Sequence, residues 1–109
     1  MSSTQRRTGT PHRSLQQRLR ALERANQVRH ERAELKRELA AGTRQLAHLL
    51  ANPPACAQTA RVRELLLAVP GIGPARATRA LFRCRIADSK TIAGLSSRQC
   101  GELIQLLDA

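Results

Sequence analysis

A short break between two helical patterns, at residues 70–74 (Pro-Gly-Ile-Gly-Pro), constrains the fold more than any other feature of the sequence. Before the break, apolar residues recur at the i, i+3, i+4 and i+7 positions of one helix face; they are Val62, Leu65, Leu66 and Val69. This pattern predicts a helix that begins near Thr59. After the break, Pro74 stands at a position favoured for the first residue of a helix, which we expect to run to about Arg85.

A much longer helix is predicted from Ser14 to about Ala41, where the composition shifts to strong helix formers. Ser14 is its expected N-cap, with Gln17 completing a capping box, and Gly42 is the matching stop. The apolar stripe along it is narrow, which predicts a half-exposed helix; its members are Leu15, Leu19, Leu22, Val28, Leu35 and Leu39. Residues 1–13, polar and basic, are expected to form a disordered arm.

Two further helices complete the pattern. Thr43 is expected to cap a short helix that ends at Asn52-Pro53-Pro54. A turn around Ala87-Asp88-Ser89 leads to a last helix, which Ser96 opens and Gln99 completes as a capping box. No strand pattern and no repeat is visible, so the chain is predicted to be all-α.

The length and composition of the chain predict one small domain. A chain of 109 residues is long enough for one small domain, which we place at 14–109, with the region 59–109 carrying the tight turn. Phe82 is the only aromatic residue, so the core is expected to consist of Leu, Val, Ile and Ala.

The charge of the chain points to a polyanionic partner. It has 19 Lys and Arg residues against 8 Asp and Glu, a formal net charge of +11. Positive charge is spread over the whole sequence, so a phosphate backbone is the natural partner. An anionic membrane surface is disfavoured because the basic segments lack a bulky apolar face. A basic protein with a merely solvated surface is the alternative.

Composition disfavours several other classes of protein. No run approaches 20 apolar residues, so no transmembrane helix is expected. The polar start through Thr10 has no apolar stretch of the kind that a secretory signal needs. A single aromatic residue provides no platform for stacking the bases of a single strand.

Cysteines and histidines are too scattered to suggest a metal site, and neither a metal nor another cofactor is expected. The odd number of cysteines, without a C-x-x-C pair, also argues against a disulfide framework, so we expect them to fill small spaces in the core. The residues concerned are Cys56, Cys84, Cys100, His12, His30 and His48.

The tight turn suits a phosphate. Gly71 and Gly73 would let the backbone adopt positive φ and approach a ligand closely, and the following helix would present its free N–H groups there. Ile72 is expected to plug into the core, and Arg76 and Arg79 share one side of the following helix. Such a site grips a DNA backbone without reading bases. The alternative is a helix–helix corner in which glycines only permit close packing.

Three stretches resemble the actinobacterial integration host factor family, whose fold is helix-two-turns-helix. Residues 29–36 (RHERAELK) are similar to its R-x-E-R-A-E-[VL]-K segment, and 65–77 to its L-L-x-x-[LV]-P-G-[VI]-G-x-x-[RK]-A turn. Residues 86–95 are similar to the stretch before its final helix. The resemblance implies a cytoplasmic, nucleoid-associated protein that binds duplex DNA with little sequence preference and bends or organises it. It implies assistance to site-specific integration in a recombinase complex, and no catalysis.

The sequence departs from this family at the second turn. The family carries an R-R-x-R cluster there, whereas this chain has Lys90, Thr91 and Ala93. Arg85 replaces a helix-ending glycine, and Pro74 stands where Lys is frequent. We expect Lys90, Thr91 and Pro74 to contact DNA all the same, with lower affinity or an altered footprint. Five arginines are available to offset the loss: Arg76, Arg79, Arg83, Arg85 and Arg98.

The long helix carries a further basic group. Arg13, Arg18, Arg20 and Arg24 are expected either to form a second DNA surface or to be a solvated helix face. A coiled-coil seam is the third alternative, but the stripe is Ala-rich and Arg32 interrupts it. We therefore expect a monomer in solution.

Other functions remain as alternatives to duplex DNA binding. Helix-two-turns-helix modules also occur in a small-subunit ribosomal protein, so a structured-RNA protein is the main one. A DNA-repair enzyme would need a catalytic amine or carboxylate from another domain, and the chain has only two lysines. An interaction adaptor or a phage-derived relative completes the set.

Overall fold

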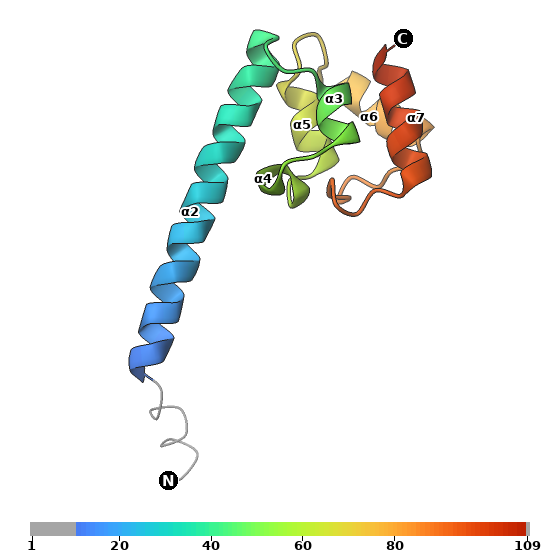
Figure 1. Cartoon of the computed structure of the whole chain (residues 1–109). Coiled ribbons are helices and arrows are strands. Elements are labelled where there is room, and N and C mark those ends of the chain that lie inside the picture. The colour runs from blue at the N-terminus through green and yellow to red at the C-terminus, as the bar shows by residue number, and fades with distance from the viewer. Residues whose placement is uncertain (1–10, 109) are drawn as a thin grey trace. The chain divides into compact units, whose positions relative to one another are not determined.

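The chain is all-α over the part that a computed structural model describes, residues 11–108, with side chains from Ser14 onward (Figure 1). Residues 1–10 of the expected arm, and Ala109, lie outside the described residues. The helices are α2 (Pro11–Ala41), α3 (Leu46–Ala51), α4 (Ala55–Gln58), α5 (Val62–Ala68), α6 (Pro74–Arg83) and α7 (Ser97–Asp108).

The chain divides into two compact units, with the boundary after His30, inside α2. The first unit thus includes the N-terminal part of α2, and the second holds the last turns of α2 and every later helix. The single domain expected over 14–109 stays a prediction.

Helix α2 begins at Pro11, three residues before the expected start. Proline is favoured at the first helical position because its missing N–H would be unpaired there. Ser14 is therefore inside the helix, and the capping box expected for it with Gln17 is wrong. The predicted end is confirmed: α2 ends at Ala41, and Gly42 adopts the left-handed φ of 81°.

The cap expected for α3 is wrong. Gln45, not Thr43, is the residue before its first turn. The Thr43 hydroxyl instead donates to the Glu38 carbonyl (3.3 Å) and so satisfies the end of α2. The helix itself carries the predicted leucines, all buried: Leu46, Leu49 and Leu50.

Helix α5 begins at Val62 rather than near Thr59. Thr59 instead caps the C-terminus of α4, a helix that was not predicted. The delay has a tertiary cause. The Ile92 amide donates to the Ala60 carbonyl (2.9 Å), and the Val62 amide donates to the Lys90 carbonyl (3.0 Å). These bonds form an isolated antiparallel bridge between Arg61 and Thr91. A partner 30 residues away holds the segment extended, and no local pattern reveals that.

Helix α6 begins at Pro74, as predicted, and ends at Arg83, slightly before the expected Arg85. Arg85 follows in the left-handed region, at φ 57°. The predicted inner face is confirmed, since each member is buried: Ala77, Ala80, Leu81 and Cys84.

The capping box of α7 is also confirmed. The Ser96 amide donates to Oε1 of Gln99, and the Gln99 amide donates to Oγ of Ser96, both at 3.1 Å. The Gln99 side chain also donates to the Arg85 carbonyl (2.8 Å), which ties the start of α7 to the end of α6.

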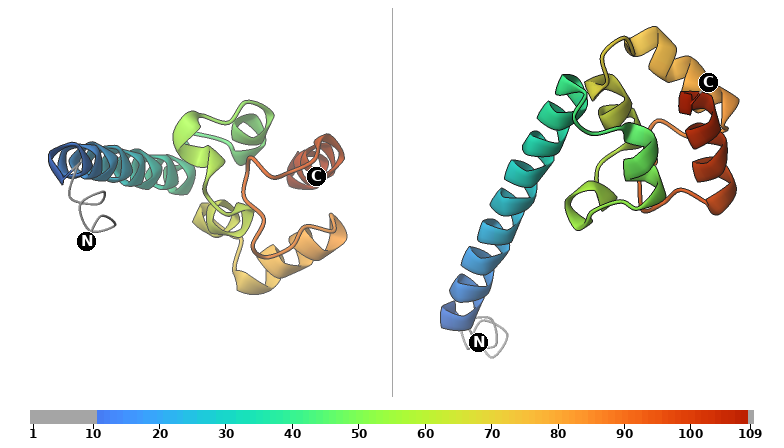
Figure 2. Two further views of the ribbon diagram at one scale, coloured as in Figure 1. Left: turned by 90° about the horizontal axis from the view of Figure 1, so that it is seen from below. Right: turned by 45° about the horizontal axis from the view of Figure 1, so that its top comes forward.

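The core of the second unit is aliphatic, as predicted. Helix α3 packs against α7, α5 against α6, and α6 against α7 (Figures 1 and 2). Between residues 14 and 108 no charged or polar side chain is buried. Cys56 and Cys84 are free and buried, and Cys100 is half-buried, which confirms cysteine as a filler of small spaces. The largest fully buried side chains are Leu39, Leu49, Leu65, Leu66, Leu103 and Val62.

Candidate nucleic-acid interface

The first turn joins α5 to α6 and has the geometry of a type II β-turn. The Ile72 amide donates to the Val69 carbonyl (3.2 Å), Pro70 occupies the second position, and Gly71 the third with φ 88°. Only glycine adopts that φ without strain, so the Pro-Gly pair fixes the direction in which the chain enters α6. The predicted positive φ at Gly71 is confirmed.

The same prediction is wrong for Gly73. Its backbone is extended, with φ −88° and ψ −178°, and it is the N-cap of α6. A Cβ built there meets no atom within 4 Å, so the space in front of Gly73 is open. The glycine is not required by the backbone. Because Gly73 has no side chain, the first amides of α6 stay uncovered.

Those amides are free to bind a ligand. The Ala77 amide makes the first helical bond, to the Gly73 carbonyl (2.9 Å). The amides of Gly73, Ala75 and Arg76 donate to no acceptor within residues 11–108. Three unpaired donors at the positive end of a helix dipole form a favourable position for an anion.

The side chains around the first turn lie mainly on the surface. Ile72 is half-buried, so it anchors the turn only in part. Arg76 and Arg79 are exposed one turn apart on α6. Arg76 donates to the Gly71 carbonyl (3.4 Å), which holds its guanidinium beside the turn. Pro74 is exposed at the first helical position.

The second turn, residues 84–95, is bound tightly to the rest of its unit. The bridge to residues 60–62 uses the backbone on both sides of Thr91, and the Ala93 amide donates to the Gln58 carbonyl (3.0 Å). Ile92 is buried, whereas Lys90 and Thr91 are half-buried. From Lys90 to Leu95, every amide except that of Thr91 already donates to a backbone carbonyl.

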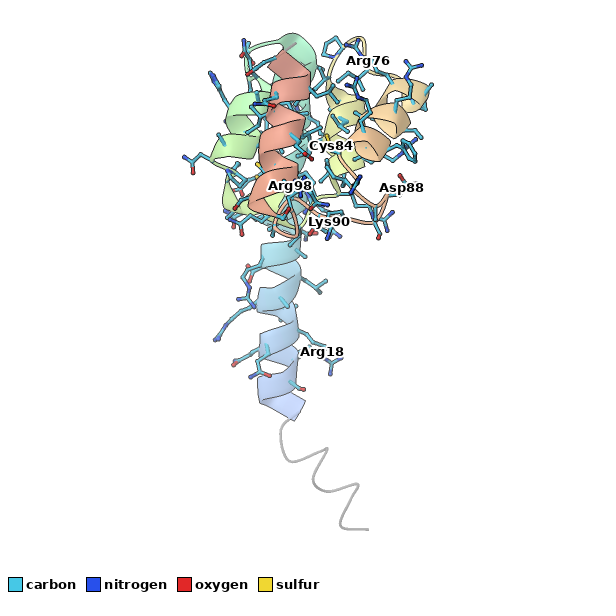
Figure 3. The ribbon with its side chains drawn as sticks, turned by 90° about the vertical axis from the view of Figure 1, so that its right-hand side faces the viewer. Arg18, Arg76, Cys84, Asp88, Lys90 and Arg98 are labelled. Atoms are coloured by element: carbon cyan, nitrogen blue, oxygen red, sulfur yellow. The ribbon has the colours of Figure 1, made fainter. Side chains whose placement is uncertain are left out.

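The structure does not gather all the predicted residues into one cluster. Figure 3 shows Arg76 at one end of the second unit and Lys90 and Arg98 toward the other. Arg98 is highly exposed in the first turn of α7 and forms an ion pair with Glu102 (3.6 Å). The predicted site consists of two separate groups, one at each turn.

Arg63 connects these two groups, and sequence reasoning missed it. Its guanidinium donates to the Thr78 hydroxyl (2.9 Å) and the Pro74 carbonyl (3.5 Å), and it lies 3.6 Å from the Asp88 carboxylate. One half-buried side chain on α5 thus contacts the first turn of α6 and the second turn. Asp88 lies 25 positions along the sequence, and no spacing rule pairs it with Arg63.

In the first unit, Arg18, Arg20 and Arg24 are exposed on α2. Arg20 and Arg24 lie four residues apart and share one face, whereas the spacing of Arg18 places it on another. The side chain of Arg13 lies outside the described residues. Three leucines of the stripe are also exposed: Leu15, Leu19 and Leu22.

The buried Cys84 thiol is not activated as a nucleophile. Burial raises the pKa of the Cys84 thiol from its ordinary value of 9.0, the nearby Glu102 carboxylate raises it further, and Arg83 opposes both. A thiol that stays protonated is a poor nucleophile. From residue 14 to 108, no three His, Cys, Asp or Glu side chains converge on a metal position. Nor does any described helix combine the length and apolarity needed to cross a bilayer.

Comparisons with known proteins agree with this geometry. Residues 54–106 match the family model of the S13-like H2TH domain. The chain is 34% identical to the integration host factor of Mycolicibacterium smegmatis over 95 residues, which cover 85% of this chain and 90% of the relative. It is 33% identical to the integration host factor of Streptomyces coelicolor over 90 residues, which cover 81% and 84%.

A solved structure is similar as well. It is described as the structure of sIHF bound to an 8 bp palindromic DNA. The two folds superpose with a TM-score of 0.72 at 30% sequence identity, over 78% of this chain and 98% of the other.

Proposed function

Because the chain belongs to the actinobacterial integration host factor family, we propose that it is an architectural protein that binds duplex DNA. It bends or organises nucleoid DNA in the cytoplasm with little regard to sequence, and assists site-specific integration in a recombinase complex. The role is binding rather than catalysis, and the protein acts as a monomer in solution. The observation that carries the proposal is the open, positively polarised start of α6 beside two exposed arginines.

The first turn grips phosphate in this proposal. A phosphate oxygen accepts hydrogen bonds from the free amides of Gly73, Ala75 and Arg76, beside the open space at Gly73. Arg76 and Arg79 pair with the next phosphates along the strand. None of these contacts reads a base, which accounts for tolerance of sequence.

The second turn contributes less. Lys90 supplies one cationic contact and Thr91 supplies a hydroxyl. Arg98 adds a neighbouring cation once its ion pair with Glu102 is replaced by a contact with phosphate. Arg63 acts as a positioning residue that holds the two turns at a fixed separation. The α2 arginines form a second DNA surface. Arg20 and Arg24 lie on one face of the helix, and Arg18 lies on another.

The proposal is tested by titrating a labelled duplex of about 30 base pairs with the full chain at several salt concentrations. About six phosphate contacts predict that log K falls with log salt at a slope near −5. Neutral and acidic polymers of the same length, added as competitors, distinguish binding to the DNA backbone from general electrostatic attraction. A slope near zero, or no binding at about 50 mM salt, would contradict the proposal.

A structured-RNA role is the second candidate, favoured by the S13-like description of the matched domain. The helix start of α6 binds phosphate equally well from either nucleic acid, since its donors do not contact a sugar or base. A folded RNA of equal charge in the same titration distinguishes the two. Duplex DNA is expected to bind more tightly; a preference for RNA of ten-fold or more would favour the ribosomal type of role.

A further inference from the structure

A recess between α6 and α7 combines two features that DNA binding does not use together. Its volume is about 460 Å³. The floor is apolar and is contributed by α5, the first turn, α6 and α7: Leu66, Val69, Ile72, Ala80, Leu106 and Leu107. Recesses of this size with a mainly apolar lining are typical of sites that bind a ligand or a side chain.

One wall of the recess is strongly cationic. Arg76, Arg79 and Arg83 lie along the same flank of α6 and are all exposed, and no acidic residue lines the recess. None of these three arginines forms an ion pair with a carboxylate in the described part. Glu102, a carboxylate on α7, lines a separate hollow together with Arg83 and pairs with Arg98.

A sugar-phosphate backbone complements only the wall of the recess. A backbone supplies charge to the arginines but no bulky apolar group to fill the recess. An acidic peptide satisfies both parts, because its carboxylates complement the wall and an apolar side chain displaces water from the floor. The continuity of wall and floor within one hollow favours a single ligand that carries both kinds of group.

We propose that this recess binds an acidic peptide segment of a protein partner. The segment inserts a bulky side chain such as Leu or Phe over Ile72 and Leu107, and its carboxylates pair with Arg79 and Arg83. The proposal deepens the proposed function, on which it rests in part, because Arg76 and Arg79 also belong to the phosphate grip. The peptide and the duplex are therefore expected to compete.

The test begins with an unbiased probe. A phage-displayed library of random 12-residue peptides is selected on the full chain at about 0.15 M salt, without DNA. The variant Arg79→Glu/Arg83→Glu serves for counter-selection. The surviving peptides are expected to share two or more carboxylates around one or two bulky apolar residues. A selection that yields no such consensus overturns the proposal.

The best peptide is then labelled and titrated by fluorescence anisotropy. Arg79→Glu/Arg83→Glu is expected to weaken binding at least ten-fold, and Leu107→Gln by a similar factor. The control Arg37→Glu/Arg44→Glu changes net charge equally at two exposed residues outside the recess and is expected to bind within three-fold of wild type. Thermal melting confirms that each variant is folded.

A change in the peptide tests the floor even where Leu107→Gln does not fold. Replacing the peptide's apolar anchor with Ser is expected to weaken binding at least ten-fold. Equal binding by the Ser peptide, or equal loss in the control variant, would show charge attraction alone and overturn the proposal. The titration contains no DNA, so a failure here leaves duplex binding untouched, and a failure of duplex binding leaves the recess result standing.

Discussion

The two turns around α6 differ in what their backbone amides do. At the first turn, a Pro-Gly pair makes one local bond and leaves the amides of Gly73, Ala75 and Arg76 unpaired within residues 11–108. At the second turn, the Ile92 amide donates to the Ala60 carbonyl in the bridge, the Ala93 amide donates to the Gln58 carbonyl, and Ile92 is buried. One turn is open to a ligand, and the other holds its unit together.

Helix-two-turns-helix geometry therefore does not make both turns equal partners for phosphate. A backbone donor that already has an acceptor cannot bind an anion as well. At the second turn, binding must depend on side chains, and this chain has one lysine where its family has several arginines. We therefore expect the first turn to dominate affinity.

The largest effect is expected from removing the arginines of the first turn. Arg76→Ala/Arg79→Ala should weaken duplex binding about 100-fold, at roughly 1.5 kcal/mol for each charge-assisted bond. The control Arg37→Ala/Arg44→Ala removes the same charge elsewhere and should cost less than about three-fold. Anisotropy titration at about 0.1 M salt measures both. Similar losses in the two variants would mean that net charge, not the turn, decides affinity.

Restoring positive charge at the second turn should strengthen duplex binding there. Thr91→Arg/Ala93→Arg is expected to tighten duplex binding about ten-fold and to steepen the salt slope by about 2, because two more phosphates are neutralised. The backbone bridge does not depend on these side chains. An unchanged slope in the salt titration would place the second turn away from DNA.

A smaller effect concerns stability at the junction of the turns. Arg85 has a left-handed φ of 57°, which costs a non-glycine residue roughly 1 kcal/mol. Arg85→Gly should therefore raise Tm by about 4 °C in a thermal melt. Arg85→Ala keeps the strain and loses the charge, and is expected to give no increase. A gain with alanine as large as that with glycine would assign the effect to charge.

The smallest effect concerns pH. Burial keeps the pKa of Cys84 in the folded chain above 9.0, so the unfolded thiol ionises first as pH rises. The free energy of unfolding should be unaffected by this thiol below pH 9 and should fall above it, by at most roughly 1.4 kcal/mol per pH unit. Cys84→Ala should flatten the fall in denaturant titrations at pH 8 to 10. Cys100→Ala should leave it unchanged, and flattening there instead would identify the wrong thiol.

Local chemistry made much of the fold predictable. The Pro-Gly turn, the start of α6 at Pro74 and the Ser96–Gln99 box each depend on residues within a few positions of each other. The buried faces of α5 and α6 followed from helical spacing for the same reason. Each of these features is determined by residues that are close together in the sequence.

Features that depend on distant partners were missed. The Arg61–Thr91 bridge delays α5 and reshapes the second turn, and Arg63 reaches Asp88 across a similar separation. Gly73 was expected at positive φ because glycine can adopt that conformation, but glycine adopts negative φ as readily. The DNA-contacting residues of the first turn therefore stay a prediction, and one structural reason given for them, a positive φ at Gly73, is wrong.

Substitution of Gly73 tests whether the start of α6 grips phosphate. Asp is a good N-cap and its Cβ would meet no atom within 4 Å at this position, so Gly73→Asp should fold at least as stably as wild type. Its carboxylate would occupy the amides of α6 and repel phosphate, whereas Gly73→Ser caps without charge. We predict that Gly73→Asp loses at least 100-fold in duplex affinity and Gly73→Ser less than ten-fold. If folded Gly73→Asp binds duplex DNA as tightly as Gly73→Ser, the start of α6 is not the phosphate grip.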